Sequence, residues 1–288
     1  MENFEAPETD SYKNETLKSS FMAEFYDGYS FKNLVDFMRR INPIAIFEFS
    51  HDRIDIFHHD TDAKHILAHV TIKGHELSQY HLKCCNTCDG NCKNGVLSIG
   101  MNLRDLQKFI KPVGKKDSLS MYKRSEDHVI YIQPTGPGSK SAQSNFSVFS
   151  PCVVKKIRIT MPPYSTPEHR PNCIIPATTL SQTCNGMNIL KSGNIRIRVI
   201  GSDLTIDNLT DDRSSGRVDT FSMKPQENSA EYEILVKVST IKALVKLSNL
   251  NPNGLIKVYT EPEVPLKMIC RINGYGKLRI YICSAQNS

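Results

Sequence analysis

A helical segment with one apolar face recurs along this chain at intervals of 63 to 74 residues, and short alternating strands follow each occurrence. The four segments begin near residues 33, 102, 176 and 239. In the first, Leu34, Phe37, Met38 and Ile41 follow the spacing of a buried helix face. A nearly constant period of this length indicates a repeated unit of helix and strands. We predict an α+β fold with two similar domains, each with two helices packed on antiparallel β-sheets.

The other helices and the strands between them follow the same pattern. Residues 102–113 and 239–248 repeat the apolar spacing, and a third helix begins at Pro176, because proline is favoured in a first turn. Residues 195–199 alternate apolar side chains with arginines, which is typical of a half-buried strand. These segments supply the strands that the helices would cover.

A proline-rich segment divides the repeat into halves. Four prolines lie between Met161 and Asn172, and proline disfavours helix interiors and central strands alike. The segment is therefore expected to run extended on the surface as an interdomain connecting loop. The predicted organisation is a flexible leader at 1–22, a first domain at 23–159, the connecting loop at 160–172 and a second domain at 173–288.

Composition excludes several classes of protein. The 288 residues carry a net charge of +6, a mild excess that permits a polyanionic partner without requiring one. No apolar run reaches the ~18–20 residues of a membrane helix, and the acidic start has no apolar region typical of a secretory signal. The nine cysteines are odd in number and mostly scattered, which indicates reduced thiols in an intracellular compartment.

Several motifs resemble one family. Glu263–Leu266 (EVPL) followed by Gly276–Ile282 (GKLRIYI) is similar to the closing pattern of the PCNA-like sliding DNA clamps, the proliferating cell nuclear antigen family. Leu97–Leu103 (LSIGMNL) resembles the segment before a helix in the first domain of these clamps, and Cys173–Pro176 (CIIP) resembles the strand that opens the second. The likeness covers roughly residues 25–284, mostly as pattern and not as identity.

The resemblance implies a fold and a function. Members of the family have two similar domains, and three subunits form a closed ring whose helices surround duplex DNA. The ring has no catalytic activity, requires no cofactor, and tethers DNA polymerase and other replication proteins, which bind through short aromatic peptide motifs. The implied location is the nucleus or a viral replication site. The mild positive charge departs from the strongly acidic eukaryotic clamps, which indicates a divergent member and makes a viral one a candidate.

A clamp that slides needs phosphate attraction without sequence preference. The second helix places four cations opposite its apolar stripe, whereas the third is mostly uncharged on its polar side. Basic residues on a single helix are more often a solvated face, but three of the four helices share this arrangement. The predicted DNA-contacting residues are Lys32, Arg39, Arg40, Arg104, Lys108, Lys111, Lys115, Lys191, Lys242 and Lys246.

The resemblance also implies a pocket under the connecting loop that receives the aromatic residues of partner peptides. Transferred position by position, the pocket comprises Phe49, Arg53, Ile159, Met161, Tyr164, Pro265, Tyr281 and Cys283. Pro265 and Tyr281 match the residue types of the family, whereas Arg53 and Cys283 do not, so the peptide preference is expected to differ. The alternative is that Tyr281 only packs within its strand.

A cysteine-rich stretch has no counterpart in ordinary clamps. His81, Cys84, Cys88 and Cys92 have the spacing of a tetrahedral zinc site, in which Cys85 could replace Cys84. A second CxxC pair, which would strengthen the prediction, is missing. These thiols could instead stay free or oxidise. A structural zinc ion is therefore one of two open interpretations.

Two alternative functions come from other classes. His51-Asp52 and His58-His59-Asp60 could indicate a metal-dependent phosphoesterase, although no further carboxylate and histidine group stands at a spacing that completes a site. A non-ring clamp-fold protein acting as a checkpoint or transcription factor is the second alternative.

For a ring, the edge strands at about 145–154 and 203–210 would pair head to tail in a homotrimer, because a heterologous contact must either close or polymerise.

Overall fold

The computed structural model describes residues 19–60, 65–83, 92–93, 95–124, 127–136, 147–152, 161–165, 168, 170–187, 193–208, 216–218 and 231–285. The helices are α2 (Gly28–Ile41), α3 (Leu103–Ile110), α4 (Ala177–Met187), α5 (Val238–Leu244) and α6 (Leu247–Leu250), with a 3-10 turn η1 (Gly74–Glu76). No helix among these residues is long and apolar enough to cross a membrane.

The strands form three antiparallel sheets. A five-stranded sheet has the order β10 (Ser147–Phe149), β9 (Ile130–Thr135), β8 (Ser118–Arg124), β1 (Ser19–Phe25) and β5 (Gln79–Leu82). A four-stranded sheet has the order β14 (Gly216–Val218), β13 (Asp203–Asn208), β12 (Asn194–Ile200) and β15 (Tyr232–Lys237). The largest sheet has nine strands, in the order β11 (Cys173–Pro176), β16 (Leu255–Tyr259), β17 (Leu266–Arg271), β18 (Lys277–Ile282), β4 (Ile66–Lys73), β3 (Arg53–His59), β2 (Ile44–Phe49), β7 (Val96–Asn102) and β6 (Cys92–Lys93).

Both halves of the chain use the same order of elements. Each begins with a strand and a helix, β1–α2 and β11–α4, and later repeats this step as β7–α3 and β15–α5. The last helix of the second half is divided into α5 and α6. The structure thus confirms the predicted α+β class with helices on antiparallel sheets.

The nine-stranded sheet joins the two halves. β18 from the end of the chain pairs with β4 from the first half, with Tyr281 opposite Leu67 and Lys277 opposite Thr71. One face of this sheet packs on the helices: His58 on β3 is buried, and its Nε2 lies 2.7 Å from the backbone oxygen of Met38 in α2. The central sheet is therefore a single layer shared by both halves.

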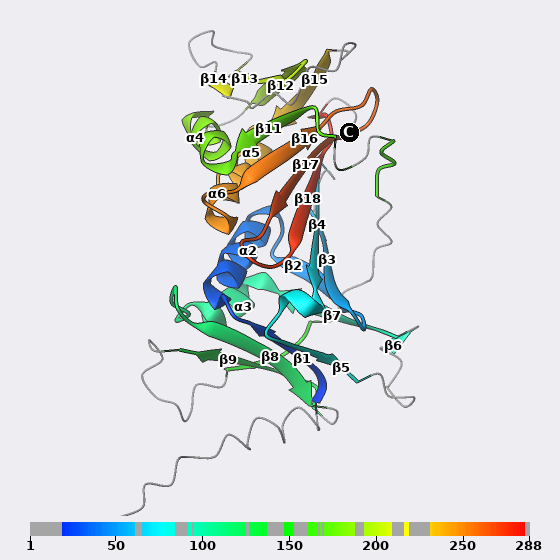
Figure 1. Cartoon of the computed structure of the whole chain (residues 1–288), viewed down its shortest axis with the longest axis vertical. Coiled ribbons are helices and arrows are strands. Elements are labelled where there is room, and N and C mark those ends of the chain that lie inside the picture. Colours follow the sequence, from blue (N-terminus) through cyan, green and yellow to red (C-terminus); the bar gives the residue numbers. More distant parts are fainter. Residues whose placement is uncertain are drawn as a thin grey trace, which may run out of the picture.

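The α-helices of the described residues, α2 to α6, lie along one side of this layer (Figure 1). α2 packs against α3, α5 and α6, and α4 packs against α5 and α6. The five-stranded and four-stranded sheets lie at opposite ends of the long axis, at the bottom and top of the view. The helical layer therefore presents one continuous side of the molecule.

Two boundaries differ from the sequence predictions. The leader predicted at 1–22 is too long, because β1 begins at Ser19 and Phe21 is fully buried against Phe49, with the two rings stacked at 4.3 Å. The segment at about 203–210 is not a sheet edge along its length, because Leu204–Ile206 of β13 pair with β14. Burial of apolar residues decides where the first domain begins. Pairing of β13 with β14, which comes later in the chain, decides which strand is the outer one.

Candidate functional site

The exposed face of α3 carries the first part of the basic row predicted from the sequence, because the helix predicted at 102–113 ends at Ile110 and Lys115 lies beyond it. The Asn102 side chain begins this helix by accepting a hydrogen bond from the backbone N–H of Arg104 at 3.0 Å. Leu103, Leu106 and Ile110 are buried, whereas Arg104, Lys108, Lys111 and Lys115 are exposed. Lys108 pairs with Asp105 at 2.8 Å, but both side chains are solvated, so the attraction is weak. The row therefore retains an exposed positive charge.

Lys32 has a structural contact at the end of α3. Its ammonium donates to the backbone oxygens of Lys111 at 2.7 Å and Val113 at 2.9 Å. Carbonyls at a helix C-terminus lack partners within the helix and favour a cation. Lys32 therefore links α2 to the residues that end and follow α3. Its predicted contact with DNA stays a prediction.

Arg39 and Arg40 of α2 share one carboxylate. Asp36 lies 3.2 Å from Arg39 and 3.8 Å from Arg40, and it also accepts a hydrogen bond from Gln107 of α3 at 2.9 Å. Asp36 offsets part of the arginine charge. Asp105 does the same for Lys108 in α3, so both helices keep a positive charge that one carboxylate lowers.

The second half contributes less charge to the helical side. The exposed residues of α4, among them Thr178, Gln182 and Asn185, are uncharged. Lys242 and Lys246 are half-buried at α5 and the following turn. Lys191 lies outside the described residues. Among the described residues, the basic charge of the helical side thus lies mainly on α2, on α3 and on the residues just after α3.

The opposite face of the nine-stranded sheet carries polar and aromatic side chains in register. Tyr259, Lys267 and Tyr281 lie side by side on β16, β17 and β18. In the next row, Arg279 of β18 lies opposite His69 of β4. Because side chains alternate along a strand, this face points away from the helices.

Tyr164 of the proline-rich connector packs on this row. Its hydroxyl donates to the backbone oxygen of Pro265, and its ring lies 6.2 Å from the ring of Tyr281. The Lys267 ammonium lies 4.8 Å from the centre of the Tyr164 ring and 5.1 Å from that of Tyr259. Lys267 is held between two aromatic rings, a cation–π arrangement that partly offsets its loss of water.

Glu168 attaches the connector at a second point. Its carboxylate accepts hydrogen bonds from Lys277 and Arg279 of β18, each at 2.8 Å, and its backbone oxygen accepts one from the Tyr259 hydroxyl. Partial burial would raise the pKa of Glu168, but the hydrogen bonds from Arg279 and Lys277 lower it to about 2. Glu168 is therefore ionised at neutral pH.

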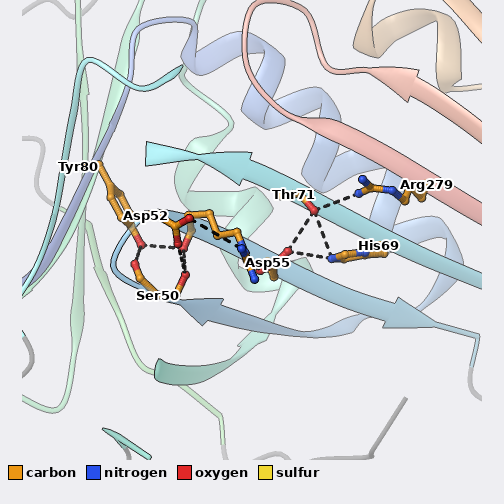
Figure 2. Close-up of polar contacts among 8 residues, drawn as sticks. Ser50, Asp52, Asp55, His69, Thr71, Tyr80 and Arg279 are labelled. Atoms are coloured by element: carbon orange, nitrogen blue, oxygen red, sulfur yellow. Dashed lines mark hydrogen bonds and ion pairs between the residues drawn. The ribbon is translucent and has the colours of Figure 1, made fainter. Parts of the chain in front are cut away.

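Arg279 extends this network into the first half of the chain (Figure 2). It donates to the Thr71 hydroxyl at 3.2 Å, which in turn donates to Asp55 at 3.1 Å. His69 Nε2 lies 2.8 Å from Asp55 and 3.3 Å from Thr71. Burial would raise the pKa of Asp55, but hydrogen bonds from His69 and Arg53 lower it. A catalytic triad uses both ring nitrogens of its histidine, whereas here one nitrogen faces both partners, so the cluster is a structural network.

No protein-family model matches the chain, and no curated protein matches it in sequence. A crystal structure of proliferating cellular nuclear antigen from Entamoeba histolytica superimposes with a TM-score of 0.71 and 15% sequence identity. The match covers 92% of this chain and 98% of that one. The chain has the PCNA-like clamp fold.

Within the clamp fold, most of the predicted pocket residues that the structure describes lie near the connector. Met161, Pro265 and Cys283 are half-buried, and Tyr281 is buried on the row that Tyr164 covers. Ile159 lies outside the described residues. Arg53 is half-exposed and pairs with Asp55 at 2.7 Å.

Phe49 is a correction to the predicted pocket. It is fully buried, and strand pairing places it opposite Ile54, on the same face of the sheet as His58. That face packs on α2, so Phe49 belongs to the core and not to the connector side. The alternation of β2 was visible in the sequence, but not which face the helices cover.

Other side chains of this surface were not predicted. Glu168 of the connector contacts Lys267, Lys277 and Arg279 of the sheet, and none of these four is among the predicted pocket residues. One signal was available: an acidic residue in a proline-rich connector, with two cations at alternate positions of the last strand.

The predicted metal ligands divide into two groups. Cys84, Cys85 and Cys88 lie outside the described residues, and of Cys92 only the strand is described, so the zinc site stays a prediction. His58 packs beneath α2, whereas the neighbouring His59 points to the other face of β3 with Nδ1 2.7 Å from the backbone oxygen of Asp60. In the described part of the chain, no three His, Cys, Asp or Glu residues are arranged to hold a metal ion. Within these residues, His58 and His59 lie on opposite faces of β3.

Proposed function

We propose that this chain is a sliding clamp that encircles duplex DNA and tethers DNA polymerase and other replication or repair enzymes, without catalysing a reaction itself. The observation that carries the proposal is the exposed basic row of α3, which lies on the helical side of the clamp fold. Such a row attracts phosphates without reading bases. We place the protein where DNA is replicated, in the nucleus or at a viral replication site.

The assembly proposed is a head-to-tail homotrimer. β10 and β14 are the outer strands of the five-stranded and four-stranded sheets, and these sheets lie at opposite ends of the molecule. Pairing β10 of one subunit with β14 of the next would repeat the same contact around a ring, and a repeated heterologous contact closes when its rotation allows. The edge predicted at residues 203–210 is covered by β14, so the contact is proposed for β14 (Gly216–Val218) instead.

Fluorescence anisotropy on duplexes of unrelated sequence tests the DNA contact. Each neutralised phosphate contributes about −0.9 to the slope of log affinity against log salt. Replacing Arg104, Lys108 and Lys111 with alanine should reduce that slope by up to about 3, equally for every duplex. A control that replaces the exposed cations Lys73 and Arg271, at strand ends, and Lys83, just after β5, should change it little. Equal slopes for both variants, or strong preference for one duplex, would refute the proposal.

Light scattering tests the ring. A trimer has three times the mass of the 32.5 kDa chain. A monomer at tens of micromolar would remove the ring and favour a non-ring clamp-fold protein with a checkpoint or transcriptional role. That alternative also predicts discrimination between DNA sequences, which the same anisotropy titration reports.

A further inference from the structure

The turn between β17 and β18 belongs to the second half of the chain but contacts the start of α2 in the first half. The Asn273 side-chain amide donates to the Asp27 carboxylate and, at 3.2 Å, to the Ser30 hydroxyl. The Tyr275 hydroxyl donates to the backbone oxygen of Asp27 at 3.0 Å. In its own half, the Asn273 N–H donates to the backbone oxygen of Leu250 in α6 at 3.0 Å. The turn therefore links α6 to α2.

The backbone of the turn is shaped for these contacts. Asn273 has a φ of 40° and Gly276 a φ of 83°, both in the left-handed region. Glycine adopts this region freely, and asparagine is one of the few other residues that do. The Gly276 N–H then donates to Glu76 of η1 at 3.1 Å, and Arg271 lies 3.7 Å from the same carboxylate. The turn is therefore bonded to two separate segments of the first half, α2 and η1.

The carboxylate that receives the Asn273 amide also begins α2. Asp27 accepts hydrogen bonds from the Ser30 N–H at 2.9 Å and from the Ser30 hydroxyl at 2.6 Å, so it caps the helix. This one carboxylate joins the helix to a residue 246 positions away. Further along α2, the Asn33 side chain donates to the backbone oxygen of Asn249 at 2.9 Å, and Lys32 contacts the end of α3. The contacts thus continue from the turn through α2 to the helix with the basic row.

The nine-stranded sheet joins the two halves through a single strand pair, β18 and β4. Arg279 and Thr71 lie within this pair, so their hydrogen bond adds little resistance to rotation about it. α2 also packs against α5 and α6, which keeps the halves together, but apolar packing has no directional preference. Hydrogen bonds require defined distances and angles. The contacts of the turn therefore fix the angle between the halves more narrowly than packing alone.

We propose that the turn at residues 272–276 is an interdomain clasp, which binds Asp27 and Glu76 and sets the angle between the helices of the two halves. Asn273 is then a positioning residue for DNA binding, because it acts through α2 and α3 and not through a phosphate. The clasp keeps the cations of these helices on one surface with the helices of the second half. The inference rests on the proposed DNA contact.

Energy transfer between two dyes measures the distance between the halves in the whole protein. The dyes are attached through unnatural amino acids at the exposed positions Lys83 and Ile200, and unlabelled protein in excess restricts the signal to single chains. Asn273→Asp places a second carboxylate beside Asp27, so the open population should rise about tenfold or more and broaden the distribution. Asn253→Asp is the matched control, because it adds the same charge at an exposed asparagine, and should change nothing.

Two further variants test the contact itself. Asn273→Gly keeps the left-handed backbone and removes only the amide, so it should broaden the distribution less than Asn273→Asp. In the double variant Asp27→Asn with Asn273→Asp, the amide and the carboxylate exchange places, and asparagine begins helices as well as aspartate does. This exchange should restore the single distribution of the wild type. A wild-type distribution for Asn273→Asp, or a distribution that stays broad after the exchange, would overturn the inference.

DNA affinity separates positioning from simple stabilisation. Asn273→Asp should weaken binding to every duplex by up to about tenfold relative to Asn253→Asp, because only the clasped form presents all the helices together. The salt slope should stay the same, since no phosphate contact is removed. A lower urea midpoint with unchanged DNA affinity would make Asn273 a structural residue only and overturn the proposal. The distance measurement needs no DNA, so a wild type that bound no DNA would remove the clamp proposal while the distances still decided the clasp.

Discussion

His58 makes the stability of the protein depend on pH in the mildly acidic range. Its ring is 1% exposed and donates from Nε2 to the backbone oxygen of Met38, which ties β3 to α2. Burial lowers its pKa from 6.5 to about 4. The unfolded chain therefore binds a proton between these values while the folded chain does not. Stability falls as the pH falls through this window, by about 2 kcal/mol at pH 5 relative to pH 7.5.

The measurement is urea denaturation at several pH values between 7.5 and 5, with the free energy of unfolding compared between variants. His58→Gln keeps a donor near Met38 and cannot titrate, so the difference in unfolding free energy between wild type and variant should change by about 2 kcal/mol across that range. His75→Gln, at an exposed histidine, is the control and should change it little. A constant difference for His58→Gln would mean that the ring is hydrated and that this reasoning is wrong.

Two further substitutions separate structural from surface roles. Lys32→Met should lower the free energy of unfolding by about 1 kcal/mol, because α3 loses its cation at the C-terminus, while the salt slope of DNA binding stays the same. A slope smaller by about 0.9 would instead make Lys32 a phosphate contact. Phe49→Ala should cost about 3–5 kcal/mol in urea denaturation, whereas Arg53→Ala should cost less than about 1 kcal/mol. If both substitutions lowered the free energy of unfolding by less than about 1 kcal/mol, the placement of Phe49 in the core would be wrong.

Much of the fold was predictable because its signals are local. The apolar spacing of α2 and α3 and the alternation of β12 can be read within a few residues, and the recurrence of these units indicated two similar halves. The basic row of α3 was predictable for the same reason: helical spacing alone places Arg104, Lys108 and Lys111 opposite Leu103, Leu106 and Ile110. Segment ends were less certain, as β1 shows, because burial against distant residues decides them.

What the sequence determined by itself was therefore the type and order of the elements and which side chains share a face. Only the tertiary structure decided which face the helices cover, and with it that Phe49 is in the core while Tyr281 lies under the connector. It also decided that β18 pairs with β4, which brings Arg279 to Thr71 across 208 residues of chain. Periodicity is set by local backbone geometry, whereas these contacts depend on strand pairing between distant segments, which no spacing along the chain specifies.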